Sequence, residues 1–256
     1  SVILTLGFRA LWIGGAGVLL LVTLPLIYLL LSQERTPRIK PGEASESQSA
    51  DPRHWRRRDV LREPAFWALL LGILAPAFMM TCLFFHQLHL VEIKSWSPVV
   101  FAFGFMVFAI TQVGAAFVVG FVIDTFSARF LLPVMLLPMG VGLWLPFLFQ
   151  DAAIVFALMF LLGLTGGTAS AIMGALWPEL FGAQFLGEIR ALAYSAMVVS
   201  SAASPFITGY LIDAGIAFPL QLAVMGGYCL LASALMGLIQ PRLAAIVGPK
   251  DPESIP

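Results

Sequence analysis

Seven long stretches of this chain contain no Asp, Glu, Lys or Arg, and this feature most restricts the folds open to it. The stretches are 21 to 29 residues long and cover 10–33, 64–91, 95–123, 130–150, 152–178, 191–212 and 214–241. A helix rises about 1.5 Å per residue, so about 20 apolar residues cross a hydrocarbon core about 30 Å thick. The sequence therefore predicts an all-α membrane protein with seven transmembrane helices.

The composition excludes several other classes of protein. Charged residues make up 11% of the chain, and 14 acidic residues balance 14 basic ones, so we expect no nucleic-acid partner. Cys82 and Cys229 both lie inside apolar stretches, without the spacing of a metal site or a disulfide framework. We therefore expect no metal and no cofactor. Because no H-E-x-x-H, G-x-S-x-G or Walker pattern occurs, we do not expect an enzyme.

The basic residues between the stretches predict an orientation in the membrane. The segment 34–63 contains eight Lys or Arg residues, and positively charged loops stay cytoplasmic. Alternation of the remaining loops then places twelve basic residues inside and only two, Arg9 and Lys94, outside. We expect the N-terminus of this sequence outside and its C-terminus inside, with the lipid bilayer as a partner. Arg outnumbers Lys by 11 to 3, which is typical of a GC-rich bacterial gene and favours a bacterial cytoplasmic (inner) membrane.

The segment 34–63 itself divides into two parts. Residues 41–52 are rich in Ser, Glu, Gln and Pro and are expected to be disordered. Residues 54–62 are basic and include Trp55, which is consistent either with a short amphipathic helix on the inner leaflet or with a plain topology signal. The sequence begins Ser-Val-Ile-Leu, and we expect it to be the later part of a longer protein.

A short pattern occurs twice, three predicted helices apart. Gly120-Phe-Val-Ile-Asp124 ends the third stretch and Gly209-Tyr-Leu-Ile-Asp213 ends the sixth. The expected orientation puts the first copy at the inner surface and the second at the outer surface. A three-helix unit repeated with opposite topology is a device of secondary transporters.

These motifs resemble those of the major facilitator superfamily. Gly120-x3-Asp124-x4-Arg129 is similar to the family's loop motif G-x-x-x-D-R-x-G-R, with Thr125 in place of the usual Arg. The run from Trp177-Pro-Glu-Leu-Phe to Gly182, followed by Gly187-Glu-Ile-Arg190, is similar to the monocarboxylate and oxalate/formate-like branch. The resemblance covers essentially the whole chain.

The resemblance implies one six-helix lobe built of two inverted three-helix repeats, plus one preceding helix. Residues 1–33 would be the last helix of a missing N-terminal lobe, 34–63 the cytoplasmic central linker, 64–241 the C-terminal lobe and 242–256 a cytoplasmic tail. The missing lobe of the same chain would then be a partner of this one. Together the lobes would bind a small-molecule solute near the midplane and expose it to alternate sides.

Polar residues within the apolar stretches are the candidates for contact with that solute. They are His86, Gln87 and His89 near the outer end of the second stretch, Gln112 in the third, and Thr165, Thr168 and Ser170 in the fifth. Each also has a structural interpretation, because a polar group in a span can face interfacial water or bond to a neighbouring helix. Ser195, Ser200, Ser201 and Ser204 in the sixth stretch are expected mainly to pack against a neighbouring helix. A coupling proton would be carried by His86 or by the missing lobe.

The loop motif residues are the candidates for gating. In the family pattern Asp124 pairs near a neighbouring helix and locks one state, with Gly120 and Arg129 in the same motif. Glu179, Glu188 and Arg190 are expected to form a matching cluster on the inner side, and Gly209 and Asp213 to form the second copy of the repeat.

The sequence thus favours part of a secondary active transporter, with a small organic anion such as a monocarboxylate as the substrate implied by the branch. The alternatives are a drug or metabolite efflux carrier of the same superfamily, a seven-helix receptor and a channel. A retinal protein is disfavoured because Lys40, Lys94 and Lys250 all lie outside the stretches.

Overall fold

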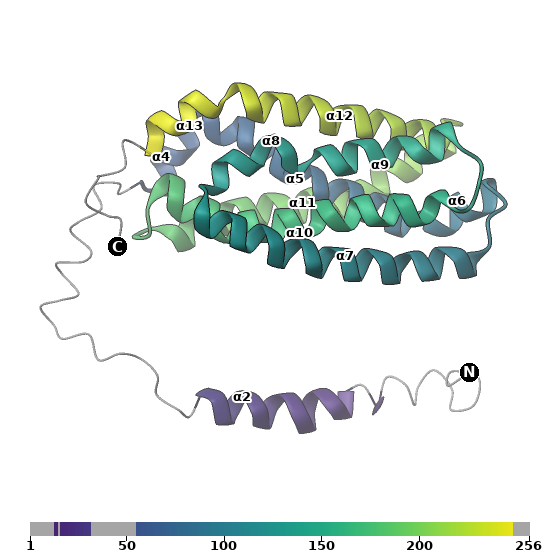
Figure 1. Ribbon diagram of the computed structural model, residues 1–256, viewed down its shortest axis with the longest axis horizontal. Coiled ribbons are helices and arrows are strands. Elements are labelled where there is room, and N and C mark those ends of the chain that lie inside the picture. Colours follow the sequence, from purple (N-terminus) through teal and green to yellow (C-terminus); the bar gives the residue numbers. More distant parts are fainter. Residues whose placement is uncertain (1–12, 15, 32–54, 248–256) are drawn as a thin grey trace, which may run out of the picture. The chain divides into compact units, whose positions relative to one another are not determined.

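A computed structural model describes residues 13–14, 16–31 and 55–247 of the chain, and its ribbon is shown in Figure 1. The chain divides into two units, 1–50 and 51–256. Within the first unit a π-helical turn, η1 (Leu19–Thr23), leads into α2 (Leu24–Leu31). The apolar helix over Ala16–Leu29 is shorter than a membrane span, and residues 10–12, 15, 32 and 33 of the predicted 10–33 helix fall outside the described residues.

The second unit contains six helical segments that are long and apolar enough to cross a membrane. They are α5 (Pro64–Phe85), α7 (Pro98–Thr125), the composite span Ala128–Leu148, α10 (Ile154–Phe181), α11 (Leu186–Asp213) and α12 (Phe218–Leu238). The composite span consists of the 3-10 helix η2 (Ala128–Leu131), α8 (Leu132–Met135) and α9 (Leu137–Leu148). The fold class and the six spans predicted between residues 64 and 241 are confirmed.

Three short helices lie at the two ends of this bundle. α4 (Arg57–Arg62) precedes α5 and α13 (Gln240–Val247) follows α12, and both lie at one end, here called the α13 end (Figure 1). α6 (Gln87–Ile93) follows α5 at the opposite end, here called the α6 end. Local signals set the starts of the spans, since Glu63 and Ser97 accept hydrogen bonds from Ala65 N and Val99 N, and a proline follows each cap.

The packing of the six spans follows an inverted repeat. α7 packs along α10 as α11 packs along α5, α9 contacts α10 as α12 contacts α5, and α9 contacts α12. Exchanging the first three spans with the last three leaves this pattern unchanged, although α5 and α10 run in opposite directions. The spans therefore form an arc in the order α11, α5, α12, α9, α10, α7, and α7 and α11 at its ends are the least buried.

The α7–α10 pair is held at backbone contact by two glycines. A Cβ built on Gly163 would lie 2.7 Å from Phe108 O, and one on Gly167 would lie 2.3 Å from Gln112 O. No side chain fits between the two backbones at these points. Glycines four residues apart permit such an approach between membrane helices.

The equivalent α5–α11 pair is joined by hydroxyl groups instead. Ser204 Oγ donates to Phe78 O over 2.6 Å, and Ser200 Oγ donates to Leu74 O over 3.5 Å. Farther along the seam, Thr208 Oγ1 lies 3.2 Å from the thiol of Cys82. The packing role predicted for the serines of the sixth stretch is confirmed at Ser200 and Ser204.

The composite span is broken between α8 and α9, and its neighbours compensate for the lost helical bonds. Ser233 of α12 donates to Pro133 O on one side of the break, and Thr165 of α10 accepts from Met139 N over 3.0 Å on the other. Both hydroxyls are buried. Because a bilayer has no water to bond to these backbone groups, the two side chains make the break tolerable.

Gly167→Ala tests the backbone contact between α7 and α10. The added methyl group would meet Gln112 O at 2.3 Å and Ala115 Cβ at 2.7 Å, so we expect a loss of about 1–3 kcal/mol. The measurement is the thermal unfolding midpoint of the purified protein in detergent. Gly114→Ala is the matched control, because a Cβ there meets nothing within 4 Å. Equal midpoints for the two variants would contradict the backbone contact.

Candidate functional site

The side of the arc between α7 and α11 carries a strip of uncharged groups near the middle of the membrane-spanning helices. Gln112 lies near the middle of α7, and Gly166 lies near the middle of α10. A Cβ built on Gly166 would lie 3.4 Å from both Gln112 Cδ and Met80 Cε of α5. The side chains of Gln112 and Met80 therefore both approach the bare backbone of Gly166, where three helices come together.

The strip continues from α5 to α11 through a pair of hydroxyl groups. Thr81 Oγ1 lies 2.9 Å from Ser201 Oγ, and both side chains are half-buried. Thr81 follows Met80 directly, so the strip runs across four helices in the order Gln112, Gly166, Met80, Thr81 and Ser201. Within the described part of the chain the Gln112 amide has no hydrogen-bond partner, and its donor and acceptor are both available.

His86 lies at the α6 end of the same α5–α11 seam. Its Nε2 donates to Pro205 O over 3.2 Å, and a Cβ on Gly209 would be 3.6 Å from its Cε1. The ring also contacts the rings of Phe85 and Phe218, with centroids 5.1 and 5.7 Å away. His86 thus packs against Pro205 and Gly209 of α11 and against Phe218 at the start of α12. It therefore connects α5, α11 and α12 at the α6 end.

The other polar residues predicted beside His86 point elsewhere. Gln87 lines a cavity of about 220 Å³ with apolar side chains of α6 and α7, including Phe101. His89 lines another cavity of about 400 Å³ with Lys94, Gln150 and the segment joining α11 to α12. Lys94 donates to Phe149 O and Gln150 Oε1, and burial lowers its pKa. The structure does not bring Gln87 into one site with His86.

The two threonines predicted on α10 differ in their surroundings. Thr165 is fully buried and bonds to the break before α9, so its position supports a structural role rather than contact with a solute. Thr168 is half-buried and makes no side-chain hydrogen bond within the described region, whereas Ser170 donates to Gly167 O of its own helix. Thr168 is therefore the polar α10 side chain nearest in sequence to Gly166 that stays available.

The loop motif and Glu179 come together at the α13 end. Both carboxylate oxygens of Glu179 accept hydrogen bonds, one from the Ser127 hydroxyl and the other from Ala128 N over 2.8 Å. Gln240 of α13 donates to Arg129 O, and the Arg129 guanidinium lies over the Phe130 ring. Glu179 therefore caps the start of η2 and joins it to the end of α10.

The remaining motif residues do not form the predicted cluster. Arg190 Nη2 donates to Gly174 O over 2.7 Å rather than to a carboxylate, and Glu188 lines a separate cavity with Arg57. Asp124 is exposed and has no bond to any residue that the structure describes. The two copies of the repeat, Gly120–Asp124 and Gly209–Asp213, end α7 and α11 at opposite ends of the bundle, as their predicted inversion requires.

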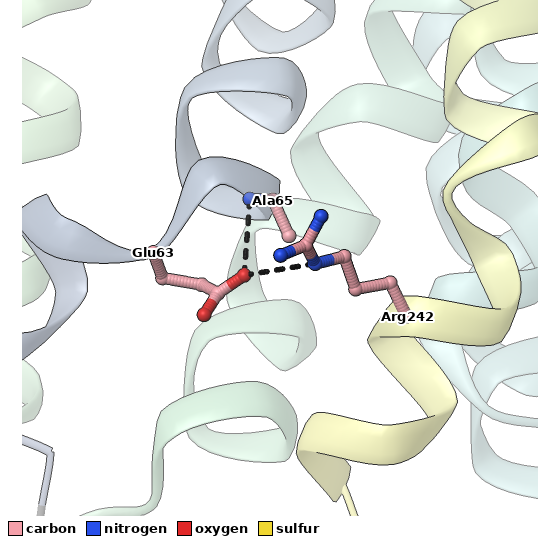
Figure 2. Close-up of polar contacts among 3 residues, drawn as sticks. All are labelled: Glu63, Ala65 and Arg242. Atoms are coloured by element: carbon pink, nitrogen blue, oxygen red, sulfur yellow. Dashed lines mark hydrogen bonds and ion pairs between the residues drawn. The ribbon is translucent and has the colours of Figure 1, made fainter.

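One ion pair ties the start of the bundle to its last helix. Figure 2 shows Glu63 Oε1 accepting from Ala65 N at 3.3 Å and pairing with Arg242 Nε at 3.3 Å. The Arg242 side chain is 60% exposed, so the pair contributes less than about 1 kcal/mol. Its role is to position α13 against the first turn of α5.

The basic segment before α5 packs on the bundle rather than standing apart from it. α4 buries Val60, the Trp55 ring meets Phe181 edge-on with centroids 5.6 Å apart, and the Arg56 guanidinium lies 4.9 Å above the Phe185 ring. Trp67 Nε1 also donates to Leu61 O. The short helix considered for 54–62 forms over Arg57–Arg62 and contacts α5 and α11, while Trp55 before it contacts the end of α10.

Sequence reasoning missed Met80, Thr81 and Thr208. Met80 and Thr81 lie in an apolar stretch, where a single hydroxyl or thioether group does not indicate a binding site. The available signal was spacing: Ser200, Ser204 and Thr208 recur every four residues on one face of α11 and required a polar or small partner on α5.

The family model described as Major Facilitator Superfamily matches residues 77–253, which is more than half of the chain. A search of curated proteins gave no match.

Glu179→Ala tests the cap on η2. The change removes two charge-assisted hydrogen bonds, and we expect a loss on the order of 2 kcal/mol in the free energy of unfolding. The measurement is denaturant or thermal unfolding in detergent. Glu188→Ala is the control, since it removes the same charge from an exposed site at the same end of the bundle. A loss no larger for Glu179→Ala than for the control would contradict the cap.

Proposed function

This chain belongs to the Major Facilitator Superfamily, a family of membrane transporters rather than enzymes, and from that premise we propose that it forms part of a secondary active transporter. Residues 64–241 would be the C-terminal lobe, 1–33 the last helix of the N-terminal lobe, 34–63 the central linker and 242–256 the tail. The lobes would move a small solute by alternating access. The receptor and channel interpretations lose their basis with the family match.

The observation that carries this proposal is the strip formed by Gln112, Gly166, Met80, Thr81 and Ser201. It lies near the middle of these helices on the side of the arc between α7 and α11, the two least buried spans of the second unit. Binding of solute at the midplane between two lobes is the general arrangement in such carriers. We propose that this strip is the C-terminal lobe's share of the solute site, with Thr168 beside it.

The substrate we propose is a small organic anion such as a monocarboxylate. The support is the sequence from Trp177 to Gly182 and the residues Gly187 to Arg190, which resemble that branch of the superfamily. The strip itself is neutral, so the cationic partner that a carboxylate requires would come from the N-terminal lobe. A neutral strip with a thioether equally suits an apolar drug or metabolite, and efflux is the second candidate.

The ends of the lobe would then act as gates. We propose a cytoplasmic location for the α13 end, because its loops carry most of the basic residues, and a bacterial inner membrane as the location of the protein. Asp124 and Arg129 would form the loop motif of the inner gate, with Glu179 fixing the loop. His86 would act at the outer gate and is the candidate carrier of a coupling proton in this lobe.

Gln112→Leu in the full-length protein tests the strip. Loss of one hydrogen bond to the solute costs about 0.5–1.5 kcal/mol, so we expect the KM for uptake to rise by roughly 2- to 13-fold. The measurement is uptake of a series of radiolabelled monocarboxylates into cells or proteoliposomes. Val113→Ala is the control, because it changes the next residue on α7, whose side chain is exposed.

Two outcomes would contradict the proposal. Absence of saturable uptake for every carboxylate would exclude the anion version and leave efflux to be tested by dye or drug export. An unchanged KM in Gln112→Leu, alongside measurable uptake, would remove the strip from the site.

A further inference from the structure

Pro178 leaves one carbonyl of α10 without its helical hydrogen bond. In an α-helix the N–H of residue 178 would donate to the carbonyl of Gly174, and proline has no N–H. Pro76, Pro146 and Pro205 have the same effect on Gly72, Gly142 and Ser201 in their own helices. Of these four carbonyls, Gly174 O is the one that receives a side-chain donor in the described part of the chain.

Arg190 supplies that donor from the next helix. Its Nη2 donates to Gly174 O over 2.7 Å, across the hairpin that joins α10 to α11. A Cβ built on Gly174 would meet nothing within 4 Å, so the space beside this part of α10 is open. A charged donor makes this a stronger bond than a neutral one. The Nε of the same guanidinium is buried and has no partner among the residues that the structure describes.

The position of this bond in the arc gives it mechanical importance. α10 packs along α7 and α9, whereas α11 packs along α5, so the two consecutive helices belong to different tightly packed pairs. They contact each other only sparsely. The bond from Arg190 to Gly174 O therefore bridges the two pairs at the α13 end.

We propose that Arg190 is a positioning residue that latches α10 to α11 at the cytoplasmic mouth in one state of the carrier and releases in the other. This inference rests on the proposed function, since it requires a lobe that changes shape during transport. The latch can open because the guanidinium lies at the end of the bundle, where water can solvate it once it leaves the carbonyl. The orphan carbonyl is exposed as well and can also be hydrated.

Pro178→Ala provides a direct test, because alanine returns the missing N–H to Gly174 O and makes the Arg190 donor redundant. The reporter is Ala193→Cys, a fully buried position near the start of α11 at the same end, which a maleimide reaches only when α11 moves away from its neighbours. The full-length protein in membrane vesicles is labelled with a maleimide from the cytoplasmic side. The native Cys82 and Cys229 are buried and give a low background.

The expected pattern is a double-mutant cycle with strong coupling. Arg190→Ala should speed labelling of the reporter about tenfold in the Pro178 background, the effect of losing one charged hydrogen bond. In the Pro178→Ala background the same change should alter labelling by less than about twofold, because the helix then bonds its own carbonyl. Arg58→Ala controls for loss of a positive charge at this end, since Arg58 is exposed.

Three results would overturn the latch. They are an equal effect of Arg190→Ala in both backgrounds, no effect in either, and the same acceleration by Arg58→Ala. Labelling requires no substrate, so the latch is judged independently of uptake. A protein with normal coupling of Arg190 to Pro178 and no transport of any solute would contradict the proposed function and leave the latch standing as a conformational contact.

Discussion

Every backbone N–H and C=O of this lobe that lies in hydrocarbon must find a partner inside the protein, and the details of the structure follow from that constraint. Regular helices meet it along most of the chain. At two departures from a regular helix, a side chain from a neighbour supplies the missing partner. Thr165 and Ser233 do so at the break before α9, and Arg190 does so at the carbonyl exposed by Pro178. Polar side chains that look like candidates for binding a solute are therefore partly committed to the backbone.

The two halves of the inverted repeat pack in the same way, but different chemical groups make the contacts between their helices. The α7–α10 and α5–α11 pairs occupy equivalent places, yet the first is a contact of bare backbones at Gly163 and Gly167, and the second is a row of hydroxyl groups. A backbone contact has a single close-packed arrangement. Hydroxyl groups can exchange partners as one helix moves along another, so the α5–α11 pair is the more adaptable of the two.

The sequence was sufficient for the class of fold, because the absence of charge over 20 or more residues has few explanations. It also located the inverted repeat, since Gly120–Asp124 and Gly209–Asp213 lie at opposite ends of the bundle. The candidate functional site was harder to predict from the sequence. Thr165 and Thr168 look alike in the sequence, but only Thr165 accepts a hydrogen bond from Met139 N at the break before α9. The strip from Gln112 to Ser201 depends on how four helices are rotated about their axes, and outside the four-residue spacing on α11 the apolar stretches give little information about that rotation.

The difference between the α7–α10 and α5–α11 pairs also determines which positions of this lobe tolerate mutation. At Gly163 and Gly167 any larger residue meets backbone atoms, so nearly every substitution there is expected to be lost during selection. Along α5 and α11, alanine, serine and threonine are close in volume and can replace one another in the row. A library aimed at new transport specificity should therefore place its diversity on the hydroxyl side of the arc and leave the glycine side as the fixed frame.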